Sequence, residues 1–179
     1  MDVNALMVFL IPNARRWITD QRNKHRPHSS ALTPQTIRSL HQYFRHVTLE
    51  RAQIRIVDQI ENPPFYTDLI KMGIEGLIDF RKMAGITFDD TILINKLCSG
   101  IPPPLTLMFH EFVHVAQYGL LGVGEFARQY VLGWAENGFS YESIPLEFEA
   151  FALQTQFERS PQSYFSVEEV IEKRQGIIH

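Results

Sequence analysis

Residues 105–118 read LTLMFHEFVHVAQY, and this stretch decides the fold. Prolines precede it and Gly122 follows it, so the pattern predicts a helix from about Pro103 to Leu120. Apolar side chains occupy almost every position around this helix. A helix that is apolar on all sides is a buried one, and we therefore expect it at the centre of the molecule.

The same helix carries His110-Glu111-Phe112-Val113-His114, an H-E-x-x-H motif. At about 100° per residue, His110 and His114 lie about 40° apart and one turn along the axis, so both imidazoles can face one ion. Glu111 projects from the flank of the helix. Two ordinary core histidines bonded to carbonyls are the alternative, but burying this pair and a carboxylate without partners is costly. A divalent cation satisfies all three side chains, and the motif favours Zn²⁺.

A catalytic zinc site needs a third protein ligand and an open position. The H-E-x-x-H-x-x-G-x-x-H extension of the metzincins is absent, because residues 117–121 hold no histidine. The candidates are Glu147 and Glu149, which fall on opposite flanks of a helix predicted over 145–159. Helical periodicity does not decide between them, but Phe151 extends the apolar face of the helix on the Glu147 side and makes that flank the more buried one. We therefore favour Glu147 as the ligand and leave Glu149 as a supporting or surface carboxylate.

The motif followed by Glu147-Phe148-Glu149-Ala150 resembles the gluzincin type of zinc metallopeptidase, whose third ligand is a glutamate in an E-x-x-x-D or E-x-x-A-D pattern. Residues 50–158 are also similar to small bacterial zincin-like domains, which share a strand ahead of the metal helix. At position 151 this chain has Phe, where many gluzincins carry an Asp that orients a ligating histidine.

The resemblance implies a hydrolase, a metalloprotease that acts on peptide or protein substrates. His110, His114 and Glu147 would hold Zn²⁺, which lowers the pKa of a water towards about 7, and Glu111 would take the proton as general base. A second hypothesis is a zinc-stabilised, non-catalytic binding or accessory module on the same scaffold. Only the first hypothesis predicts a hydrolysis that is lost in Glu111→Gln while zinc is retained.

The rest of the chain predicts a mostly helical α+β fold, a single zincin-like domain over residues 1–179 with a small β-sheet packed beside the metal-binding helix. Its expected parts are N-terminal helices in 1–46, a metallopeptidase-like core at 50–158 and a C-terminal helix at 166–176, which a capping-box pattern at Ser166 starts. Within these parts we expect helices at 3–24 (broken or kinked near Pro12), from Pro34 to about His46 (capped by Thr33), at 125–136 and at 145–159, and a strand at 52–57. Residues 86–95 form either one strand or a tight hairpin, and Thr91–Asn95 is the expected partner of an extended substrate through strand addition.

The composition argues against several other functions. A net charge of −3 disfavours nucleic acid as a partner, and the single cysteine, Cys98, excludes an intrachain disulfide. No apolar run reaches the roughly 18–20 residues of a transmembrane segment. Residues 5–11 are apolar, but Asp2 precedes them and no small-residue cleavage site follows, so we expect a cytoplasmic protein without a signal peptide. The histidines at positions 25, 28, 41 and 46 are expected to be solvated. Tyr118, one turn beyond His114, could donate to an oxyanion of the transition state, but packing is its expected role.

Overall fold

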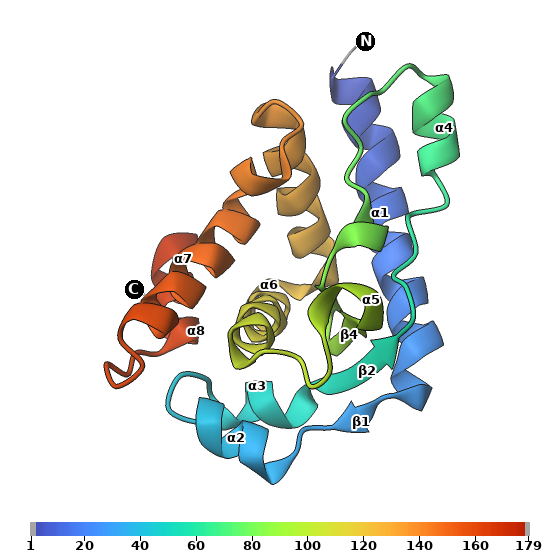
Figure 1. Cartoon of the computed structure of the whole chain (residues 1–179). Helices are drawn as coiled ribbons and strands as arrows, with labels where there is room; N and C mark the ends of the chain where they lie inside the picture. Colours follow the sequence, from blue (N-terminus) through green and yellow to red (C-terminus); the bar gives the residue numbers. More distant parts are fainter. Residues whose placement is uncertain (1–2, 178–179) are drawn as a thin grey trace.

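The computed structural model describes residues 3–177, with side chains from Leu6 onward. Its helices are α1 (Val3–His25), α2 (Pro34–Leu40), α3 (His46–Arg51), α4 (Tyr66–Lys71), α5 (Lys96–Ser99), α6 (Leu105–Glu136), α7 (Pro145–Arg159) and α8 (Val167–Gln175), with 3₁₀ turns at Arg26–His28, Phe80–Lys82 and Tyr141–Ser143. Figure 1 shows α6 in the middle of the molecule, with α7 and α8 on one side and α1 and α4 on the other. The expected mostly helical α+β fold is confirmed.

A small mixed sheet lies beside α6. Its strands are β1 (Ser30–Ala31), β2 (Gln53–Val57), β3 (Gly85–Phe88) and β4 (Thr91–Asn95), in the order β1-β2-β4-β3. The β2–β4 pair is parallel, and the other two pairs are antiparallel. Because β4 has a strand on each side, the expectation that Thr91–Asn95 pairs with a substrate is wrong. Because β3 and β4 pair antiparallel, residues 86–95 form a hairpin. The sequence alone did not decide between one strand and a hairpin.

The core consists of two clusters of apolar side chains that contact opposite faces of β4. Ile92 and Ile94 belong to one cluster and Leu93 to the other, as the period of two along a strand requires. The first cluster includes side chains of α2, α3, α7 and α8, and the second includes side chains of α1 and α4. Every residue of β4 is buried, because apolar layers cover both of its faces.

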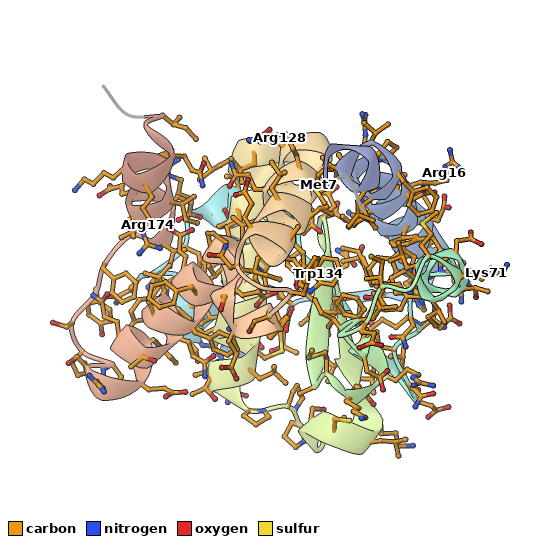
Figure 2. The ribbon with its side chains drawn as sticks, turned by 90° about the horizontal axis from the view of Figure 1, so that it is seen from above. Met7, Arg16, Lys71, Arg128, Trp134 and Arg174 are labelled. Atoms are coloured by element: carbon orange, nitrogen blue, oxygen red, sulfur yellow. The ribbon has the colours of Figure 1, made fainter. Side chains whose placement is uncertain are left out.

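Gly122 divides α6 into two helices. Its φ of 73° and ψ of 161° lie outside the helical region, in a conformation that favours glycine. We call residues 105–121 the first half of α6 and residues 123–136 the second half. The break agrees with the two separate helices expected from the sequence. Figure 2 shows α1 alongside the second half, with Met7 at their contact.

Several local expectations are confirmed and others are corrected. Thr33 caps α2 and Ser166 caps α8, each through its side-chain oxygen. The helix expected up to about His46 ends at Leu40, and α3 is a separate helix. Helix α1 continues through Pro12 without a break. Within residues 3–177, none of the helices combines the length and the apolar character that a membrane crossing requires.

Candidate metal centre

Three buried side chains meet between the first half of α6 and the start of α7. The Nε2 atoms of His110 and His114 lie 3.2 Å apart, and each is 3.3 Å from Oε2 of Glu147. The exposed fractions of the three residues are 5%, 5% and 4%. Ligand atoms around a tetrahedral zinc ion with bonds of 2.0–2.1 Å are expected about 3.3 Å apart. The donor types and their spacing therefore fit a zinc ion.

Two tyrosines hold the Glu147 carboxylate in place. Tyr130 donates a hydrogen bond to Oε1 over 2.9 Å from the second half of α6, and Tyr141 donates to Oε2 over 2.7 Å from the turn before α7. Burial and then the charge of Glu147 raise the pKa of both phenols, so both hydroxyls remain protonated donors. Sequence reasoning missed both tyrosines, because nothing in their spacing links them to Glu147.

A chain of polar side chains fixes the orientation of His114. The amide nitrogen of Gln117 donates to the Leu146 carbonyl over 3.0 Å and to Oε2 of Glu149 over 2.9 Å. The amide oxygen therefore faces Nδ1 of His114, at 2.8 Å, and must accept a hydrogen bond from it. With Nδ1 protonated, Nε2 of the neutral ring is the nitrogen free to bind a metal.

Glu149 thus acts on the candidate centre indirectly. Its second contact is an ion pair with Arg174 of α8, at 3.4 Å, and only 2% of Glu149 is exposed. The structure brings Glu147, rather than Glu149, beside the two histidines. The reading of Glu149 as a surface carboxylate is wrong, and its contact with Gln117 fits the supporting role.

His110 has no such support among the residues that the structure describes. Its Nδ1 atom is buried and has no hydrogen-bond partner within residues 3–177. The ring of Phe151 packs against the imidazole instead, with centroids 4.5 Å apart. Phe151 occupies the position where the gluzincin pattern has an Asp, so the departure noted in the sequence coincides with an unpaired nitrogen.

Glu111 lies on the same helix, outside the group of three ligand atoms. Its carboxylate accepts a hydrogen bond of 2.7 Å from the Thr87 hydroxyl of β3. A Cβ atom at Gly85 would stand 2.5 Å from Oε1 of Glu111, so glycine at this position lets β3 approach the carboxylate. Burial raises the pKa of Glu111, against the opposing effect of the two histidines. A buried carboxyl group with a raised pKa suits proton transfer near neutral pH.

Within the centre, His114 and Glu147 carry opposite charges. Burial alone would favour the neutral form of both groups, but each stabilises the charge of the other. The nearby Glu147 carboxylate raises the pKa of His114 to about 9, and the two histidines hold the pKa of Glu147 well below its usual range. In the metal-free protein, His114 and Glu147 therefore form an ion pair at neutral pH.

We expect the metal-free protein to lose stability as the pH rises from about 6.5 to about 9. The folded-state pKa of His114 is raised to about 9, above an unfolded value of about 6.5, so its contribution is complete below the lower value and lost through the upper one. Melting temperatures of chelator-treated protein across this range measure the effect. The control is Glu147→Gln, in which the decline should largely disappear; an equal decline in both proteins would contradict the ion pair.

Other side chains singled out in the sequence lie apart from this centre or only line it. Tyr118, one turn beyond His114, is buried and stacks on Phe126 with centroids 3.7 Å apart, which matches a packing role. His28, His41 and His46 are exposed as expected. His25 is buried against Gln21, so its expected solvation is wrong.

Comparisons of the chain with protein-family models, with curated proteins and with solved structures give no match. The gluzincin resemblance therefore stays an expectation from the motifs, and the geometry of the centre is the observation that supports a function.

Proposed function

We propose that this protein is a zinc-dependent metallopeptidase that hydrolyses peptide bonds of peptide or protein substrates. The observation that carries the proposal is the group of His110, His114 and Glu147, with ligand atoms 3.2–3.3 Å apart and a buried carboxylate, Glu111, beside it. Structural zinc sites are usually closed by four protein ligands. Three ligands and an adjacent carboxylate favour a site with one position left for chemistry.

The roles of the residues follow from their contacts. When bound, a zinc ion acts as a Lewis acid that acidifies a water and polarises a carbonyl oxygen. Glu111 takes the proton of the attacking water and later donates it to the leaving amine, and Thr87 fixes the orientation of the carboxylate. Tyr130 and Tyr141 keep Glu147 directed at the histidines. Gln117 accepts the Nδ1 proton of His114, so Nε2 is the nitrogen that would bind the metal.

An extended substrate would pair with β3 rather than with β4. The sheet ends at β3, and this strand carries Gly85 and Thr87, which contact Glu111. Strand addition at such an edge supplies main-chain hydrogen bonds and brings a peptide bond close to the base. We therefore assign the pairing with an extended substrate to β3, whereas the sequence led us to expect it for Thr91–Asn95.

A zinc-stabilised binding module without turnover is the second candidate function. The observation that favours it is Nδ1 of His110, which has no hydrogen-bond partner within residues 3–177. Metal-binding histidines almost always donate this hydrogen bond, and its loss lowers metal affinity or activity. Both candidates predict about one equivalent of zinc and a melting temperature that falls on chelation.

Digestion of a broad peptide library by the zinc-loaded chain, followed by mass spectrometry, tests the proposal. We expect cleavage that is lost with a chelator and restored by zinc, and that is absent from a parallel preparation of Glu111→Gln. The absence of cleavage by a protein that holds one zinc would favour the binding module. Absence of zinc binding would overturn both candidates.

We expect Phe151→Asp to raise zinc affinity by about 10–100-fold, because it offers an acceptor to Nδ1 of His110, which has none among the described residues. Phe151 is 41% exposed, so a carboxylate there keeps part of its hydration. Competition with a chromogenic chelator measures the affinity. The matched control is Phe151→Leu, which removes the ring without adding an acceptor; equal affinities of the two variants would refute this explanation.

A further inference from the structure

An apolar cavity of about 100 Å³ opens beside the candidate metal centre. Glu111, His114 and Glu147 belong to its lining, and most of the other lining residues come from α1, the segment 63–88 and the second half of α6. The cavity therefore joins the candidate centre to the interior of the second apolar cluster.

The lining is suited to an uncharged group. Among the residues that the structure describes, the lining side chains that ionise near neutral pH are Glu111, His114 and Glu147. Most of the other lining residues are aliphatic or aromatic, among them Trp17, Ile18, Met83, Phe88, Val131 and Trp134. A charged group placed among these side chains would lose its hydration without gaining a partner. The lining therefore selects against acidic and basic occupants.

Helix α1 contributes one wall of the cavity through Leu10, Ala14, Trp17 and Ile18. This helix lies outside residues 50–158, the part of the sequence in which we noted a resemblance to small bacterial zincin-like domains. Its position is fixed by contacts with the second half of α6 and by the bonds of Arg22 to Asp90, 2.9 and 2.8 Å long, at the β3–β4 turn. Because α1 is held at both places, the wall that it forms can limit the size of a group that enters the cavity.

We propose that the cavity binds one branched aliphatic side chain of the substrate, of leucine size, beside the peptide bond that is cleaved, and that α1 sets the upper size limit. An engineered apolar cavity of about 150 Å³ holds benzene, so a cavity of about 100 Å³ suits a leucine side chain and excludes a long acyl chain. This inference rests on the proposed peptidase function.

The first experiment tests occupancy without any hydrolysis. Both tryptophans of the chain, Trp17 and Trp134, line the cavity, so halothane bound there should quench their fluorescence saturably. We expect this response with and without zinc, and an at least fivefold weaker affinity in Ala14→Phe, which narrows the cavity. Val8→Phe is the matched control, because Val8 is on α1 but exposed and outside the lining, and it should behave as wild type.

The second experiment measures kcat/KM for peptides that differ at one position, with Leu, Phe, Gly, Asp or Lys. The zinc-loaded wild type should prefer Leu over Gly, Asp and Lys by about tenfold or more. Leu10→Ala removes side-chain volume from the wall formed by α1 and so enlarges the cavity, which should shift the substrate preference towards Phe. Ala14→Phe narrows the cavity and should shift the preference towards smaller side chains. Opposite shifts in two folded variants would not follow from a general loss of stability.

The outcomes separate this inference from the function on which it rests. Cleavage with no preference among the peptides, or with the same preference in all variants, overturns the inference and leaves the peptidase intact. Halothane quenching without cleavage of any peptide overturns the peptidase and, with it, this use of the cavity. Competition of halothane by palmitate, without competition by a leucine peptide, would assign the cavity to an acyl chain and overturn the inference.

Discussion

Glu147→Ala is expected to lower the zinc affinity of the protein by roughly a thousandfold or more. The substitution removes one of three ligand atoms and leaves the hydroxyls of Tyr130 and Tyr141 without their acceptor. The two histidines alone supply two nitrogen ligands, whereas a catalytic zinc site has three protein ligands. Competition against a chelator of known affinity measures the loss, and circular dichroism shows whether the helices persist.

Glu149→Ala provides the comparison for this experiment. Glu149 contacts Gln117 and Arg174, and it reaches His114 only through the amide of Gln117. Without this acceptor the amide can turn over, and we expect zinc affinity to fall by about 10–100-fold. A larger loss in Glu149→Ala than in Glu147→Ala would reverse the assignment of the two carboxylates. Equal, small losses would mean that neither residue binds the metal.

Glu111→Gln is expected to reduce peptide hydrolysis by about 10²–10⁴-fold while zinc affinity and melting temperature stay close to those of the wild type. The glutamine amide oxygen can still accept the hydrogen bond of Thr87, so the contact between α6 and β3 persists. A neutral amide, however, cannot take the proton of the attacking water. Measurement of kcat alongside zinc content separates the loss of the base from loss of the metal.

His110→Ala is the informative control for this variant, because it should lose zinc and activity together. If Glu111→Gln lost zinc to the same degree as His110→Ala, Glu111 would be a ligand and not a base. If Glu111→Gln retained full activity, the buried carboxylate would have no role in the reaction.

Much of the local structure could be predicted from the sequence, because its causes are local. The all-round apolar character of residues 105–118 predicted a buried helix, and the spacing of His110 and His114 predicted that their side chains share one face. Caps at Thr33 and Ser166 have short-range patterns, and both are present. Pro145 marked the start of α7. In each case, the deciding interaction spans only a few residues.

The hairpin at residues 86–95 marks the limit of this local reasoning. Alternation predicted extended structure there, but one strand and two were equally compatible with the pattern. Pairing of β2 with β4 rather than with β3 depends on segments more than thirty residues apart, and this pairing made β4 an inner strand. The expectation that a substrate pairs with β4 failed for this reason.

The choice between Glu147 and Glu149 shows what the sequence determined and what only the tertiary structure decided. Helical periodicity placed the two carboxylates on opposite flanks of α7 and favoured Glu147, without identifying a single partner for either residue. The hydrogen-bond donors to Glu147 come from the second half of α6 and the turn before α7, and the side chains that contact Glu149 come from the first half of α6 and from α8. Side-chain direction along one helix is fixed by backbone geometry, whereas a contact between helices depends on how the whole chain packs around them. The sequence by itself therefore determined the ligand types and the helices that carry them, and only packing decided which carboxylate meets the histidines and which supports them.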